Sequence, residues 1–199
     1  MENLPETVNT QSVALAIYNP TPGTKAIDIR RQMLQLPEVA KSLSGVEKYI
    51  FAASTKMQIA DIDDGTLIAK TGQMFRFIAM DVGYIIPTNP EDWAYICTRL
   101  LDILKKYYSQ MTLADIKLAF ELATTGELDD YLPKDSQGNP DKKHYQQFNA
   151  DYFAKILNAY RRKQNGVIHK AYKALPEPKK ELTPEEKRYY HNQTVARCR

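Results

Sequence analysis

The sequence predicts a mainly α-helical protein: a small helical bundle with an irregular N-terminal region and an extended basic C-terminal tail. Two observations carry this prediction. Apolar side chains recur at helical spacing between about residues 89 and 164, as on the buried face of an amphipathic helix. Residues that cap helices stand in front of these apolar stretches. The composition, 43% hydrophobic and 26% charged over 199 residues, is ordinary for a globular protein of one domain, or of one domain and a smaller one.

The first part, residues 1–88, is expected to be mixed and mostly helical. The short apolar run at 13–17 fits a strand or a packed extended arm. Apolar positions between residues 27 and 36 predict a helix, and Pro37 should end it and begin a second short helix. Ser44 and Glu47 have the spacing of a capping box, so a helix should begin there and run to about Asp61.

Residues 63–65, Asp-Asp-Gly, are expected to form a turn. Residues 67–86 contain β-branched and aromatic side chains in no clean period, and we favour a helix there. The three aspartates at 61, 63 and 64 resemble the start of a calcium loop. The glutamate needed at the twelfth position is missing, because that position is Gly72, so a turn is the better interpretation.

The second part, residues 89–165, predicts a module of three helices. Asn89 can cap the first, with Pro90 at the first helical position. Thr112 and Asp115 have the spacing of a capping box for the second, and Gly126 is a typical residue just past its end. Asn149 can cap the third. The segment 127–148 between the last two helices is polar and is expected to be an exposed insert.

Cations at 161–163 are expected to end the third helix, because positive charge favours the C-terminal end of a helix dipole. The third part, residues 166–199, would then be a basic, partly flexible tail. Within it we expect a short helical piece at 167–174, a linker rich in Pro, and a last helix with almost no apolar face.

The basic charge of this sequence is concentrated at its C-terminal end. Residues 160–199 hold eleven Lys and Arg against four Asp and Glu, whereas residues 1–159 hold sixteen against twenty. Tyrosines lie among these cations, and the pair of residue types can bind phosphates and stack on bases or anchor a protein interface. A solvated tail is the third interpretation. The residues expected to bind nucleic acid or a partner are Arg161, Arg162, Lys163, Lys170, Tyr172, Lys173, Lys179, Lys180, Arg188 and Tyr189.

No cofactor and no metal site are expected. The histidines at 144, 169 and 191 are far apart in sequence, and Cys97 and Cys198 form no Cys-x-x-Cys pair. The chain lacks the glycine-rich loops that bind nucleotides. The first residues lack a signal peptide, and no stretch is apolar enough to span a membrane, so a cytoplasmic location is expected.

Nucleophile and base cannot be paired from the sequence, so the chain is expected to be non-enzymatic. One arrangement would favour an enzyme instead: a pocket joining His144 to Asp115 or Asp151, with strongly shifted pKa values.

Two stretches carry a family resemblance. Residues 111–128 contain Asp-Ile-x-x-Ala-Phe and end on Gly-Glu-Leu, and residues 144–162 contain Phe-x-x-x-Tyr-Phe-x-x-Ile-Leu-x-Ala-Tyr. This order resembles a module of phage and mobile-element replication accessory proteins, and the helix with Trp93 is similar to the start of phage helicase-loader domains. The resemblance covers about residues 90–165 and implies an all-α adaptor that docks on a replicative helicase or another replisome protein.

The leading hypothesis is therefore a phage-type DNA replication accessory protein, such as a helicase loader or replisome organiser. Its basic tail would touch DNA or the partner. The alternative is a phage structural or assembly protein, or a host-directed adaptor, that acts through protein–protein contacts. Tyrosine-rich C-terminal residues and an N-terminal half that matches nothing favour this alternative.

Overall fold

The computed structural model describes residues 13, 16–141, 148–176 and 188, and these residues are mainly helical, as predicted. They contain two isolated β-bridges and no strand. The helices are α2 (Ala26–Met33), α3 (Pro37–Ser42), α4 (Gly45–Ala53), the short 3-10 helix η1 (Ile59–Asp61), α5 (Asp64–Asp81), α6 (Pro90–Tyr107), α7 (Leu113–Thr124) and α8 (Ala150–Lys173).

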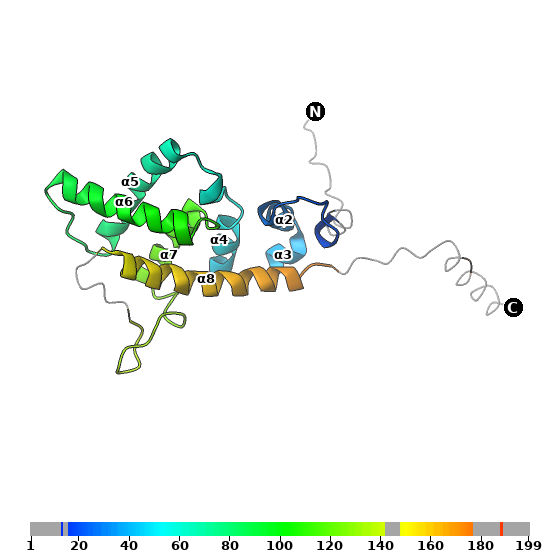
Figure 1. Cartoon of the computed structure of the whole chain (residues 1–199). Helices are drawn as coiled ribbons and strands as arrows, with labels where there is room; N and C mark the ends of the chain where they lie inside the picture. The colour runs from blue at the N-terminus through cyan, green and yellow to red at the C-terminus, as the bar shows by residue number, and fades with distance from the viewer. Residues whose placement is uncertain (1–12, 14–15, 142–147, 177–187, 189–199) are drawn as a thin grey trace, which may run out of the picture.

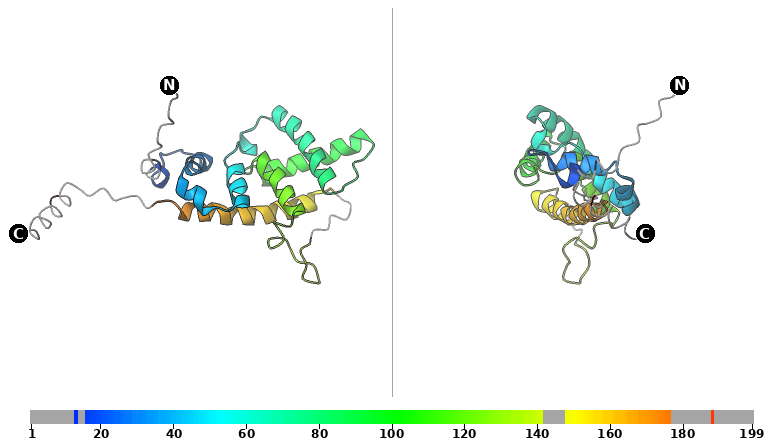
Figure 2. Two further views of the ribbon diagram at one scale, coloured as in Figure 1. Left: turned by 180° about the vertical axis from the view of Figure 1, so that it is seen from behind. Right: turned by 90° about the vertical axis from the view of Figure 1, so that its right-hand side faces the viewer.

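Helix α8 is the longest of these helices and forms the spine of the bundle. It runs along one side of the molecule, where α3, α4, α6 and α7 pack against it, while α5 packs on α6 and α7 (Figures 1 and 2). The helices α5 and α6 lie toward the N-terminal end of α8, and its C-terminal half extends past α4 to α3 (Figure 1). None of the described helices is long and apolar enough to cross a membrane.

The predicted caps are present. In the box at Ser44, the Glu47 amide donates to the Ser44 hydroxyl and the Glu47 carboxylate accepts from the Ser44 amide at 2.6 Å. The box at Thr112 has the same pattern with Asp115. Asn89 and Asn149 cap α6 and α8 with their side-chain oxygens. These caps satisfy backbone amides that a helix leaves free, which is why the sequence located four helix starts.

A single apolar core connects the bundle. Its buried residues extend from Ile17 to Leu175, and at its centre the rings of Phe75, Phe120 and Phe148 surround Phe153 of α8. The Phe153 ring lies between 4.6 and 5.5 Å from the other three ring centres, within the range of favourable aromatic contacts. Burial of these side chains fixes α5 and α7 on α8.

Several predictions about the first half were wrong. The helix that begins after Ser44 ends at Ala53 and not near Asp61. The chain then turns, and the amides of residues 59 and 60 donate to carbonyls of Met111 and Ser109. Residues 63–65 do not form a separate turn but the start of α5. The Asp63 side chain caps this helix by accepting a hydrogen bond from the amide of Thr66 at 2.9 Å. Residues 16–18 are helical, where a strand or extended arm was expected.

The end of the third module helix was also predicted wrongly. Helix α8 continues without a break from Ala150 to Lys173, across the expected boundary between residues 165 and 166. Val167 and Ala171 lie on its buried face, at 4% and 0% exposure. The energy gained by burying them outweighs the weak helix preference of Gly166.

The insert at 127–148 is less exposed than its composition indicates. Leu128, Leu132 and Phe148 are buried in the core, so the described parts of the insert are fastened at both ends. Gly126 has φ +86°, the left-handed conformation that ends α7 and sends the chain into the insert. Between these anchors, Asp135 accepts hydrogen bonds from the amides of residues 137 and 139 and shapes a tight exposed loop.

Candidate nucleic-acid and partner interface

The exposed face of the C-terminal half of α8 is basic. The exposed residues opposite the buried stripe are Arg161, Arg162, Asn165, His169, Tyr172 and Lys173, and exposed Gly166 and Lys170 lie at the edge of this face. The one acidic residue of α8 is Asp151, in its first turn. The last three turns therefore present positive charge without a carboxylate of the same helix.

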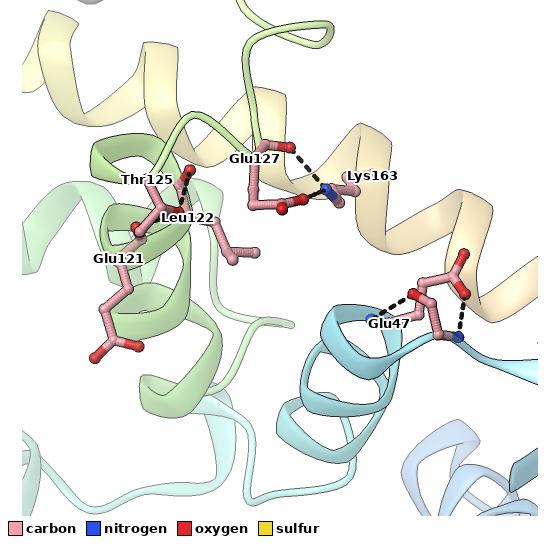
Figure 3. A network of polar contacts seen from close by, with 7 residues as sticks. Glu47, Glu121, Leu122, Thr125, Glu127 and Lys163 are labelled. Carbon is pink, nitrogen blue, oxygen red and sulfur yellow. Dashed lines mark hydrogen bonds and ion pairs between the residues drawn. The ribbon is translucent and has the colours of Figure 1, made fainter.

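Two cations on one flank of α8 hold the bundle together. Lys163 donates to the carbonyl and the carboxylate of Glu127 at 2.7 and 2.9 Å, which ties the insert to the helix (Figure 3). Lys170 donates to both carboxylate oxygens of Glu47, at 3.0 and 2.7 Å. Glu47 therefore belongs at once to the cap of α4 and to an ion pair with α8, and these contacts hold its pKa below the ordinary value.

Three cations of the exposed face form no ion pair within the described part of the chain: Arg161, Arg162 and Lys173. The Arg161 guanidinium lies over the Tyr108 ring, 5.8 Å from its centre. Arg162 donates to the carbonyl of Tyr131. Both partners are neutral, so they position the guanidinium groups and leave their charge uncompensated. An anion on this face would meet three cations that are not already neutralised.

We call the set Arg161, Arg162, Tyr172 and Lys173 the α8 basic face. It brings together four of the ten residues that the sequence proposed as binding residues. Lys163 and Lys170 lie on one flank of the helix, where each has a carboxylate partner. Arg188 is exposed, and Lys179, Lys180 and Tyr189 lie outside the described residues.

A buried carboxylate joins α7 to α8. Asp115 is 2% exposed, and its Oδ1 accepts from the Tyr160 hydroxyl at 2.8 Å and from the Gln164 side-chain amide at 2.7 Å. Its other oxygen accepts from the Thr112 amide. Burial raises the pKa of Asp115, while these hydrogen bonds oppose the rise. Burial and the neighbouring carboxylate also raise the pKa of Tyr160.

This buried group is suited to structure and not to catalysis. The Tyr160 ring is fully buried, so no substrate reaches the carboxylate through it. The Thr112 hydroxyl donates to the carbonyl of Ala53 at 3.1 Å, which extends the network to the end of α4. The sequence showed Asp115 as a cap and Tyr160 as a core residue. Their contact was not predicted, although Tyr160 and Gln164, four residues apart, share one face of α8.

An apolar groove runs between α5 and the start of α7, and sequence reasoning missed it. A hollow of about 380 Å³ there is lined by Met74, Phe77, Ile78, Leu113 and Ala114, with polar residues Lys70, Gln73, Asp81 and Lys117 around them. A second hollow of about 500 Å³ continues toward Lys56 and Asp63, and the two share Lys70, Leu113 and Ala114. Phe77 and Met80 are about half exposed.

Among residues 13, 16–141, 148–176 and 188, no three His, Cys, Asp or Glu side chains gather as a metal site would require. Cys97 is a half-buried free thiol, and burial raises its pKa, so its reactive thiolate form is disfavoured. Comparisons with models of known families, with curated proteins and with solved structures found no match to this chain. The resemblance to replication accessory proteins thus rests on the sequence pattern alone.

Proposed function

We propose that this chain is a non-enzymatic, phage-type DNA replication accessory protein, such as a helicase loader or replisome organiser, that binds DNA through the α8 basic face. The observation that supports DNA binding is the set of three cations without an ion-pair partner in the described residues, beside exposed Tyr172. Lys and Arg neutralise phosphates, and an exposed tyrosine can stack on an unpaired base. The replication part rests on the resemblance over residues 90–165.

The electrostatics of the bundle support a binding role for this face. Lys163 and Lys170, two turns apart on one flank of the helix, are already neutralised by Glu127 and Glu47. A bound phosphate backbone would therefore lie along the exposed stripe beside them, where the cations are not neutralised. Asp115 supports the hypothesis that the chain is not an enzyme. Its pKa is raised by burial inside an enclosed hydrogen-bond network, and not in an open pocket.

Salt dependence of DNA binding tests this proposal. If Arg161 and Lys173 each contact one phosphate, replacing both by Gln should make the slope of log K against log salt less steep by about 1.8, at about 0.9 per contact with duplex DNA. The assay is fluorescence anisotropy of a labelled duplex over a range of salt concentrations. Arg162 is left unchanged, because its bond to Tyr131 also holds the insert.

The matched control is the double variant Arg76→Gln/Arg99→Gln. Both residues are exposed, and they belong to α5 and α6, the helices that lie toward the N-terminal end of α8 (Figure 1). Their replacement changes the net charge by the same amount. The control should keep the wild-type slope. Equal losses in both double variants would show that net charge, and not the α8 basic face, determines binding.

The tail needs a truncation that spares α8. Removal of residues 166–199, the whole of the tail expected from the sequence, would delete buried Val167 and Ala171 and damage the core. A stop after Pro176 keeps the helix whole. If the α8 basic face binds DNA, this shorter chain retains salt-dependent binding, and its complete loss would place binding in the tail.

The second candidate function, an assembly or host-directed adaptor, is favoured by one observation: the apolar groove between α5 and α7. Exposed apolar surface of this kind marks protein contacts more often than nucleic-acid contacts. Wild-type protein that binds DNA weakly and independently of salt, but forms stable higher oligomers, would favour this candidate.

A further inference from the structure

Helix α5 carries a stripe of exposed side chains that no other part of the described structure covers. Lys70, Gln73, Phe77, Met80 and Asp81 are exposed, and their spacing places them on one face of the helix. Phe77 is 51% and Met80 54% exposed, so two large apolar side chains of one helix face remain in contact with water. We call this stripe, together with Met74, the α5 face.

The α5 face is symmetric in a specific way. Its cation, Lys70, and its anion, Asp81, stand at equal distances from a midpoint between Phe75 and Arg76. Met74 and Phe77 are centred on the same midpoint. If two copies of α5 lie antiparallel across a twofold axis through that point, Lys70 of each copy meets the other copy's Asp81, and Met74 of each meets the other's Phe77.

The charges of this face are free for such a pairing. Lys70 and Asp81 form no ion pair within the described residues. At about 1.5 Å per residue, each lies about 8 Å along the helix from the midpoint. A Lys side chain can span the small offset produced by the usual crossing angles of packed helices. Parallel packing would place like charges opposite one another, so the charge pattern selects the antiparallel arrangement.

The groove beside the helix supplies room for the apolar contacts. The hollow of about 380 Å³ between α5 and α7 is lined by Met74, Phe77 and Leu113, and other residues of the exposed stripe also line it: Lys70, Gln73 and Asp81. Apolar side chains of a second copy can enter it as they leave water. From these observations we propose that the chain forms a twofold-symmetric homodimer through antiparallel pairing of the α5 face.

A charge-swap experiment tests whether a second copy of this chain binds the α5 face and whether the two α5 helices pair in the proposed register. The variants Lys70→Glu and Asp81→Lys each place like charges at both ends of the interface. Each should weaken dimerisation by about tenfold or more, because two attractive pairs become repulsive. An equimolar mixture of the two variants carries opposite charges at both ends and should recover the wild-type affinity as a heterodimer. The measurement is sedimentation velocity over a concentration series, with one variant labelled in the mixture.

An apolar variant gives an independent test with a matched control. Phe77→Gln should shift the wild-type species from twice the chain mass of 22.8 kDa to the monomer mass. Ile68→Gln should not, because Ile68 is as exposed, at 59%, but lies on the opposite side of α5. Circular dichroism checks that each variant keeps its helices.

Three results would overturn the proposal. One is a wild-type protein that stays monomeric up to about 0.1 mM, well above the range of specific dimers, which would leave the groove to a different protein. Another is a dimer that Phe77→Gln does not weaken. The third is a mixture of the two charge variants that stays as weak as either alone.

Discussion

Replacing Tyr160 by Phe removes one hydroxyl from the contact of α7 with α8 and leaves the ring in place. The lost interaction is the 2.8 Å hydrogen bond from this hydroxyl to Asp115, a residue that is 2% exposed. A hydrogen bond to a charged group contributes about 1.5–3 kcal/mol, and one to a neutral group about 1 kcal/mol. Water cannot replace the bond at a site this enclosed, so we expect the larger loss, about 1.5–3 kcal/mol, near neutral pH.

The loss should depend on pH. Burial raises the pKa of Asp115 above its unfolded value, so the folded state binds this proton more tightly. Stability from this group is therefore greatest in acid and falls as pH rises through the raised pKa. The Tyr160 hydroxyl stabilises the charged form, so its removal should cost about 1 kcal/mol in acid and about 1.5–3 kcal/mol at neutral pH.

Urea denaturation at several pH values measures this difference. The control is Tyr108→Phe: Tyr108 is also buried, but its hydroxyl donates to the neutral amide oxygen of Asn158 at 3.3 Å. That variant should lose about 1 kcal/mol or less, without pH dependence. A loss for Tyr160→Phe that is small, or equal in acid and at neutral pH, would refute the assignment of Asp115 as a charged acceptor.

Three further predictions concern other parts of the bundle. Burial raises the pKa of Tyr152 to about 12, so the folded state should lose stability between pH 10 and 12, seen as unfolding together with tyrosinate absorbance. Glu47→Gln should lower the free energy of unfolding by about 1 kcal/mol or less at neutral pH, because the lost ion pair with Lys170 is partly exposed. The pKa of Glu47 is lowered in the folded state, so this difference should disappear in acid, which an acid titration of both proteins checks. In thermal melts, Gly166→Ala should stabilise by about 0.5–1 kcal/mol, since its site is open and helical, whereas Gly126→Ala, at φ +86°, should destabilise by about 1 kcal/mol or more.

Helix starts could be predicted because a cap is local. The boxes at Ser44 and Thr112 need only a residue three positions later, and both form as the spacing indicated. The length of α8 could not be predicted this way. Cations followed by Gly166 are typical of a helix end. The helix continues to Lys173 because helices that are distant in the sequence bury Val167 and Ala171.

The candidate interface was predictable in its charge and not in its geometry. The sequence marked a set of cations and tyrosines, but it could not show that Lys163 and Lys170 meet Glu127 and Glu47, because the partners are far away in the chain. The α5 face was missed for a related reason. Met74 and Phe77 have the apolar character of core residues, and only the fold shows that this side of α5 lacks a neighbour.

The position of α8 as spine also sets the order in which the protein can fold. The faces of α3, α4, α6 and α7 that pack on it are made before it during synthesis. Contacts such as that of Lys170 with Glu47 join residues 123 positions apart, so closing the core means closing a long loop. A nascent chain interrupted before Ala150 would expose the apolar sides of the earlier helices, which makes it a target for chaperones and proteases until α8 is complete.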